Sequence, residues 1–135
     1  SKVQGANGTC GYREDPARNP GLTGGGVLCL QVMGLGDSKS AKTGIDYVTK
    51  SLDGHKFSLG HLYYHYYNAQ AMINHGGKEW KKYNKFFRDD LLSLQKKDGS
   101  WPTGGGHGAI NPVMTTCLCT FMLEVYYRFL PSSAK

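Results

Sequence analysis

The sequence predicts an all-α fold of antiparallel helical hairpins that form an α/α toroid or part of one. Apolar residues recur at helical spacing in five segments, and little of the chain shows the alternation typical of strands. The five segments alternate between almost wholly apolar and amphipathic. The economical packing for that order is an inner layer of apolar helices covered by an outer layer of amphipathic helices.

Two short signatures recur at nearly the same spacing. The segment QGANGTC at residues 4–10 matches QKKDGSW at residues 95–101, at an offset of about 91 residues. The segment NPGLT at residues 19–23 recurs as NPVMT at residues 111–115, at an offset of about 92 residues. An Asp-Gly pair at residues 53–54 is in register with a third copy. The period of about 45 to 46 residues is typical of repeat proteins, whose units bury their apolar faces against neighbours.

The first two predicted helices differ in character. After Pro20, a short and almost wholly apolar helix extends to a stop at Gly34, and we expect this helix to be buried. The second helix, at residues 38–52, is amphipathic. Its Ile45 and Val48 are expected to point inward, while its lysines point toward solvent.

The remaining three helices continue the alternation. Residues 59–75 form a helix that is dense in aromatic residues and ends at Gly76, a favourable left-handed stop. Residues 78–96 form an amphipathic helix, with apolar side chains spaced by three or four positions. The last helix begins at Asn111, a natural N-cap, and continues to Pro131 as a nearly all-apolar segment.

The composition fits one repeat domain over residues 1–135, with about 2.5 to 3 repeats, or a fragment of a longer chain. No apolar run approaches the roughly 20 residues needed to cross a bilayer, so we expect a soluble protein. The compartment stays open, and export by a leader that this sequence does not contain is one alternative. The spacing of the four cysteines fits neither a zinc pair nor a dense disulfide framework, which favours buried free thiols.

The segment LLSLQKKDGSW at residues 91–101 resembles the Gln-Trp repeat of squalene and hopene cyclases. The chain as a whole, from about residue 4 to 131, resembles the prenyltransferase and squalene-cyclase repeat superfamily. The resemblance implies that Gln95 caps a neighbouring outer helix and that Trp101 stacks on it, with Asp98 and Gly99 in the junction between them. Only this copy is complete. The resemblance also implies an (α/α)6 toroid, a ring of six hairpins that needs about 270 residues, so that this chain would supply about half of one.

The catalytic motifs of the superfamily are incomplete in this chain. The D-x-D-D acid of the cyclases is missing, and the nearest acidic pair, Asp89-Asp90, is expected on a solvated outer face. Residues 115–119, TTCLC, resemble the zinc-binding segment HTCYC of protein prenyltransferases, but Thr115 stands where the ligand histidine belongs. We therefore expect neither a bound metal nor another cofactor.

The third predicted helix supplies most of the candidate binding residues. His61 and His65 are four residues apart on one helical face, which favours a polar lining of the central cavity, with a metal site or buried hydrogen-bonded histidines as alternatives. Neighbouring tyrosines favour core packing or an aromatic lining that holds an apolar ligand or a cation. The full set of cavity candidates is His61, His65, Asn68, Tyr63, Tyr67, His75 and His107.

Two further patterns have structural interpretations. The run Gly24-Gly25-Gly26 favours close contact between helices rather than nucleotide binding. The basic residues of the fourth helix favour a solvated outer face, with an anionic surface such as phospholipid headgroups, a glycan or a partner protein as the alternative. These basic residues are Lys78, Lys81, Lys82, Lys85 and Arg88. We do not expect a nucleic acid partner.

The function that the sequence favours is a non-catalytic domain that binds a ligand or partner, or acts as a scaffold. The alternatives are a terpenoid-cyclase-like enzyme whose catalytic acid lies outside this chain, a metal-dependent enzyme that uses His61 and His65, and a purely structural domain of a larger secreted protein. Because the first and last helices are apolar, we expect their edge to pair with a second copy or with the remainder of a longer chain.

Overall fold

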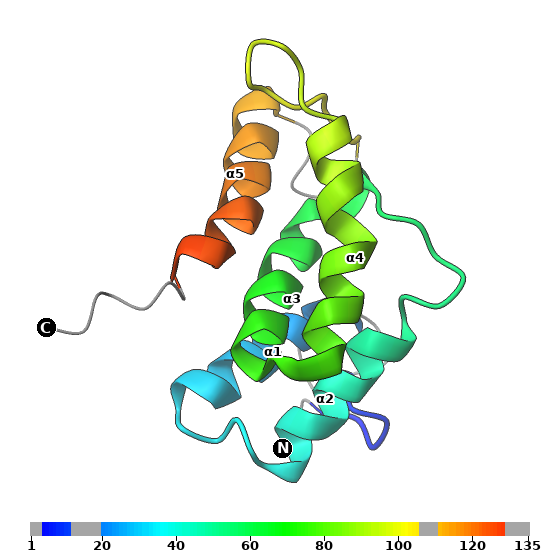
Figure 1. Cartoon of the computed structure of the whole chain (residues 1–135). Helices are drawn as coiled ribbons and strands as arrows, with labels where there is room; N and C mark the ends of the chain where they lie inside the picture. The colour runs from blue at the N-terminus through cyan, green and yellow to red at the C-terminus, as the bar shows by residue number, and fades with distance from the viewer. Residues whose placement is uncertain (1–3, 12–19, 106–110, 129–135) are drawn as a thin grey trace, which may run out of the picture.

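A computed structural model of the 135-residue chain describes residues 4–11, 20–105 and 111–128 (Figure 1). Within these residues the fold is all-α, as the sequence predicted. The five α-helices are α1 (Thr23–Val32), α2 (Lys39–Lys50), α3 (Leu62–His75), α4 (Gly77–Ser93) and α5 (Pro112–Arg128). Short 3-10 turns precede α1 and α3, at Pro20–Leu22 and Leu59–His61. Extended pairing in the described part of the chain is limited to one isolated bridge, between Gln4 and Cys10.

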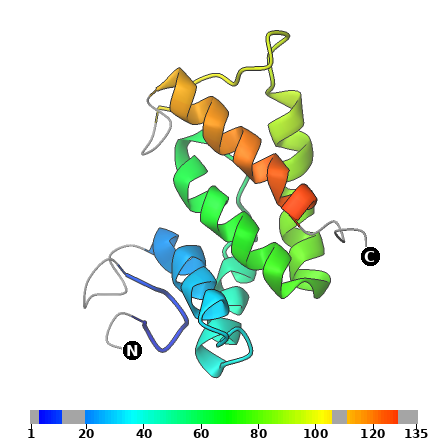
Figure 2. The ribbon, with the colours of Figure 1, turned by 90° about the vertical axis from the view of Figure 1, so that its left-hand side faces the viewer.

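The helices form two layers. In one layer α3 packs between α1 and α5, and in the other layer α2 packs against α4 (Figures 1 and 2). The layers meet where α2 packs on α1 and where α4 packs on α3. This is the hairpin arrangement with apolar inner and amphipathic outer helices that the alternating pattern predicted. Closure of such layers into a ring stays a prediction.

Local signals fix the helix ends. The Ser38 hydroxyl accepts a hydrogen bond from the Ala41 amide at 3.2 Å and so caps α2. The Asn111 side chain accepts one from the Val113 amide at 2.8 Å at the start of α5. Gly76 ends α3 with a positive φ of 74°. The predicted boundaries therefore lie within a few residues of the observed ones.

The hydrophobic core lies between the two layers. From the outer layer, α2 and α4 contribute the inward-facing side chains of Ile45, Val48, Tyr83, Phe87 and Leu91. The inner helices contribute Val27, Leu62, Met72, Cys119, Met122 and Val125. Trp101 joins this core from the connection between α4 and α5, and its side chain is only 2% exposed.

The first helix is less buried than its composition suggests. Burial in α1 is confined to Thr23, Gly24 and Val27, whereas Val32 is 81% exposed and Met33, just beyond the helix, is 69% exposed. The prediction of a buried first helix is therefore wrong for its C-terminal half. The reason is positional, because α1 is an edge helix with α2 and α3 on two sides and no further helix of the described chain on the third.

The two signature turns share one conformation. The Asn7 carboxamide oxygen accepts hydrogen bonds from the amide and hydroxyl of Thr9, at 3.2 and 2.8 Å. The Asp98 carboxylate accepts the same pair from Ser100, at 3.0 and 2.8 Å. The glycine within each turn, Gly8 or Gly99, has positive φ, at 92° and 84° respectively.

Each signature turn also docks on an inner helix through a threonine hydroxyl. The amide of Cys10 donates to the Thr23 hydroxyl at 3.0 Å, and the amide of Trp101 donates to the Thr116 hydroxyl at 3.4 Å. At the third copy Gly54 also has positive φ, but the Asp53 carboxylate pairs with Lys82 instead. The two turns thus match closely in conformation, although the second docks on Thr116, one residue beyond the Thr115 that the sequence repeat aligns with Thr23.

Candidate functional site

An open apolar groove runs along the exposed side of α1. The floor of the groove is one face of α1 together with the residues that flank the helix. The floor residues are Leu22, Gly25, Gly26, Cys29 and Met33. Tyr63 and Tyr67 of α3 form one wall, and Gln4, Cys10 and Gly11 form the other; Leu28, Leu30 and Ser40 complete the lining. We call this feature the α1 groove, and its volume is about 590 Å³.

Two glycines leave part of the floor of the groove without side chains. A Cβ atom built at Gly25 would meet only the Tyr67 ring, at an ordinary contact distance of 3.9 Å. One at Gly26 would stand 2.6 Å from the Cys10 sulfur, so only glycine lets the N-terminal segment lie directly on α1. The groove is thus open over Gly25 and closed by Cys10 over Gly26.

The tyrosine wall is a connected aromatic cluster. The Tyr63 and Tyr67 rings meet edge to face, with centroids 5.0 Å apart, and Tyr66 contacts Tyr67 at the same separation. A hydrogen bond with Tyr63, followed by burial and by the charges of Tyr63, Tyr66 and Cys29, raises the pKa of Tyr67 to about 12. Both wall phenols therefore present aromatic surface and a hydroxyl, and Tyr67 stays neutral at physiological pH.

His65 lies on the other side of α3, between the layers. Its Nδ1 atom is 2.9 Å from the hydroxyl of the fully buried Tyr83, and its ring packs 4.9 Å from that of Phe57. Burial, and secondarily the charge of His61, lower the pKa of His65 from 6.5 to about 4. The imidazole is neutral in the folded protein at physiological pH.

Asn68 follows His65 one turn later on the same side of α3. Its side chain hydrogen-bonds Tyr83, and its carboxamide oxygen is buried without a hydrogen-bond partner, against Gly24 of α1. His65 and Asn68 therefore hold the layers together and do not reach the α1 groove. Of the predicted cavity residues, Tyr63 and Tyr67 are the ones that line it.

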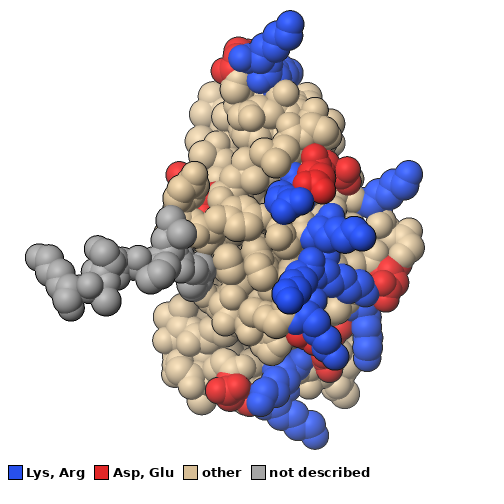
Figure 3. Space-filling view, in the orientation of Figure 1, with Lys and Arg blue, Asp and Glu red and all other residues tan. Residues whose placement is uncertain are grey.

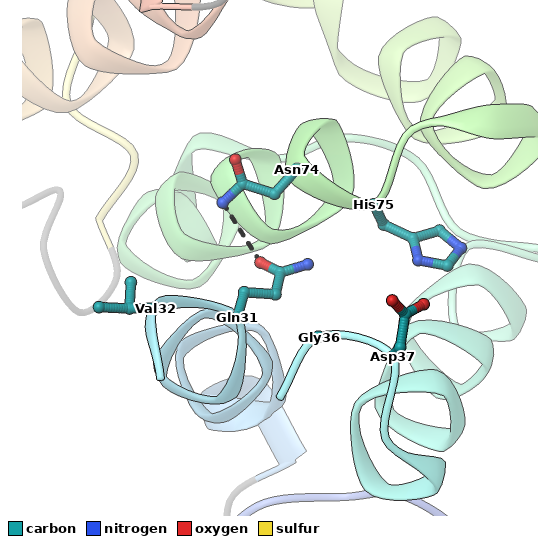
Figure 4. A pocket seen from close by; sticks show the side chains of 6 residues that line it. All are labelled: Gln31, Val32, Gly36, Asp37, Asn74 and His75. Atoms are coloured by element: carbon teal, nitrogen blue, oxygen red, sulfur yellow. Dashed lines mark hydrogen bonds between the residues drawn. The ribbon is translucent and has the colours of Figure 1, made fainter. Parts of the chain in front are cut away.

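The other predicted histidines are dispersed. His61 is exposed beside Tyr64, with ring centroids 6.1 Å apart, in a hollow of about 420 Å³ that Asn68 also lines. His75 lies near the opposite end of α3, in a polar pocket with Gln31, Asp37 and Asn74 (Figure 4). His107 lies outside the described residues.

The described residues contain no converging metal ligands. Across residues 4–11, 20–105 and 111–128, no three His, Cys, Asp or Glu side chains come together as a metal centre requires. In the TTCLC segment Thr115, Leu118 and Cys119 face the core, whereas Cys117 is exposed. Thr115 is fully buried, and its hydroxyl donates to the Asn111 carbonyl at 3.0 Å. Burial raises the pKa of the Cys119 thiol to about 12. This segment packs α5 against its neighbours.

The Gln-Trp signature stabilises the end of α4. The indole Nε1 of Trp101 donates to the Leu91 carbonyl in the last turn of α4, at 2.7 Å. The Gln95 side chain donates to the Gly99 carbonyl at 3.0 Å, within its own turn rather than to a neighbouring helix. Asp98 and Gly99 set the conformation of that turn.

The charged side chains lie mainly over the outer layer. Figure 3 shows Lys and Arg side chains gathered along α2 and α4. Several are paired with acids, including Lys82 with Asp53 at 2.6 Å and Arg88 with Asp89 at 2.8 Å. Among the described residues that line the α1 groove, in contrast, there is no Lys, Arg, His, Asp or Glu.

Sequence reasoning missed most of the groove. The spacing of three and four positions places several lining residues on one face of α1, and this pattern was visible in the sequence. These residues are Leu22, Gly25, Cys29 and Met33. Nothing local indicated that Gln4 and Cys10 fold back to form the second wall, because this contact depends on the tertiary fold.

Comparisons of this chain with protein-family models, with curated proteins and with solved structures gave no match. In the described part of the chain, each helix is too short or too polar to cross a membrane.

Acid is expected to destabilise the fold through His65. Because its pKa is about 4 in the folded state and 6.5 as a free group, protonation favours the unfolded chain. The penalty is absent above pH 6.5, grows as the pH falls, and reaches about 3 kcal/mol below the folded pKa. Urea unfolding at pH 7 and pH 4 measures this loss. A His65→Phe variant should lose less stability over that interval, and an equal loss in both proteins would contradict the assignment.

Proposed function

We propose that this chain is a non-catalytic binding domain of the squalene-cyclase and prenyltransferase repeat type, and that the α1 groove holds its ligand. The observation that carries the proposal is the groove itself, which has a glycine floor and an aromatic wall, and whose described lining residues carry no charge. Its volume of about 590 Å³ falls in the usual range for small-molecule sites, and such sites are mostly apolar.

The lining favours a neutral, largely apolar ligand. An ionic group in this groove would have no partner of opposite charge among the lining side chains that the structure describes. The hydroxyls of Tyr63 and Tyr67 and the hydroxyl of Ser40 supply a few polar contacts that can orient a ligand carrying a hydroxyl or carbonyl group. The aromatic faces of the tyrosines supply most of the contact area.

The same lining favours binding over chemistry. Proton transfer requires a titratable acid or base within reach of the substrate, and the groove offers phenols and thiols, with the pKa values of Tyr67 and Cys10 raised. His65, the side chain best suited to such work by its type, is engaged with Tyr83 between the layers.

Filling the floor of the groove tests the proposal. In Gly25→Leu the new Cβ stands at ordinary contact distance from Tyr67 and meets no backbone of another element, and because Gly25 lines the groove we expect the rest of the side chain to extend into it. We expect this variant to keep the helical circular dichroism and thermal transition of the wild type. We expect it to bind the neutral apolar probe Nile red at least about tenfold more weakly, a loss of about 1.4 kcal/mol.

The matched control removes apolar surface elsewhere. Leu92 is a large exposed apolar residue on α4, in the outer layer, so Leu92→Ala should leave Nile red binding unchanged. Equal probe binding by Gly25→Leu and wild type would place the ligand site outside the α1 groove and overturn the proposal.

A further inference from the structure

Two cysteines lie along one face of α1. The Cys10 sulfur is 2.6 Å from the point where a Cβ at Gly26 would stand, and its Cβ is 3.0 Å from that point. Cys29 lies one helical turn beyond Gly26, and residues three apart on a helix have Cβ atoms about 5–6 Å apart on the same face. Both cysteines also line the α1 groove. We propose that Cys10 and Cys29 form a reversible disulfide that ties residues 4–11 to α1.

The approach between the two thiols needs only a small slide of the N-terminal segment. A disulfide requires Cβ atoms about 3.5–4.5 Å apart, so Cys10 must move along α1 by a fraction of a turn. No side chain at position 26 blocks that path, because the residue is glycine. The described contacts that hold the segment include the hydrogen bonds from Cys10 to Thr23 and from Gln4 to the Ser40 carbonyl.

The two thiols are suited to different steps of the exchange. Cys29 is exposed and accessible to an oxidant, whereas burial, and then the charge of Cys29, raise the pKa of Cys10. With glutathione disulfide as oxidant, the Cys29 thiolate attacks one sulfur and releases one glutathione thiolate. The Cys10 thiolate then attacks the Cys29 sulfur of this mixed disulfide and releases the second glutathione. Two protein thiols are oxidised, one glutathione disulfide is reduced, and two protons pass to the glutathione thiolates or to solvent.

The remaining cysteines are poorly placed to compete. Cys117 and Cys119 lie on α5, which is separated from α1 by α3 (Figure 2). They are two residues apart on one helix, so their side chains point to different sides and cannot reach each other. Cys119 is in addition buried in the core.

Oxidation of the full chain by glutathione disulfide, followed by alkylation and trypsin digestion, identifies the bond. We expect a linked pair of peptides, one that ends at Arg13 and contains Cys10, and one over residues 19–39 that contains Cys29. The linked pair should weigh two hydrogen atoms less than the free peptides and separate on treatment with dithiothreitol. Formation should speed up as the pH rises, because more of the Cys10 thiol is ionised.

Two variants make the assignment specific. Cys29→Ser should abolish the linked pair, and Cys117→Ser, which removes another exposed thiol, should leave it intact. An alkylated Cys10 together with glutathione retained on Cys29 would show that the thiols do not meet and would overturn the proposal. A cross-link from either cysteine to the α5 peptide would overturn it as well.

The consequence for binding rests on the proposed function. A bond between two lining residues narrows the α1 groove, so the oxidised protein should bind Nile red more weakly than the reduced protein. If the linked peptides form and probe binding is unchanged, the disulfide stands and the coupling to the groove is overturned. If Gly25→Leu leaves probe binding unchanged while the linked peptides form, the ligand proposal alone fails.

Discussion

Replacing Trp101 with alanine is expected to lower the free energy of unfolding by about 3 to 5 kcal/mol. The indole is 2% exposed, it belongs to the core between the layers, and its Nε1 donates a 2.7 Å hydrogen bond to the Leu91 carbonyl. The change leaves a cavity and deprives the end of α4 of one of its hydrogen-bond donors. Urea titration monitored by circular dichroism measures the loss.

A conservative variant separates the two contributions of Trp101. Trp101→Phe keeps most of the apolar volume but removes the donor to Leu91, so we expect a smaller loss, of about 1 to 2 kcal/mol. A loss below about 1 kcal/mol for Trp101→Ala would remove the proposed role of this residue in the repeat junction.

Gly24→Ala is expected to destabilise the fold by about 2 to 3 kcal/mol, although alanine is the better helix former. A Cβ at this position would stand 2.0 Å from the Asn68 carboxamide oxygen and 2.8 Å from the backbone nitrogen and Cα of Asn68. The backbone of α3 cannot yield as a flexible side chain would, so α1 and α3 must separate. The strain also reaches the contact between Asn68 and Tyr83.

The neighbouring glycine is the matched control. At Gly25 the added methyl group meets only the Tyr67 ring at 3.9 Å, so Gly25→Ala should be neutral or should stabilise α1 by up to about 1 kcal/mol. Thermal unfolding of the two variants under one set of conditions makes the comparison. Equal stabilities would show that close packing at Gly24 does not hold the inner layer together.

The helices were predictable because their signals are local. A capping side chain such as Ser38 or Asn111, and a left-handed glycine such as Gly76, act within one turn of the residues they order. The turn at Asp98 and Gly99 belongs to the same class, since the hydrogen bonds from Ser100 to Asp98 that shape it connect near neighbours in sequence. Periodicity then gave the buried faces of α2 and α4.

The candidate site was less predictable because it depends on which face of a helix meets which neighbour. Periodicity separates the face of α3 that carries His65 and Asn68 from the face that carries Tyr63 and Tyr67. It does not say which of the two turns toward α4, and the contact between His65 and Tyr83 is what decides this. The exposure of Val32 has the same origin, because it reflects the edge position of α1 and not the composition of the helix.

The likeness between the two signature turns has a consequence for protein engineering. Residues 4–10 and 95–101 are two copies of one connecting turn. Its conformation is set by an Asn or Asp acceptor, a glycine with positive φ and a residue with a hydroxyl group. The conformation of this turn depends on its own residues, and its contact with the next inner helix is a hydrogen bond to a threonine hydroxyl near the start of that helix. The same turn sequence can therefore be reused in design to connect an additional helical hairpin to this domain.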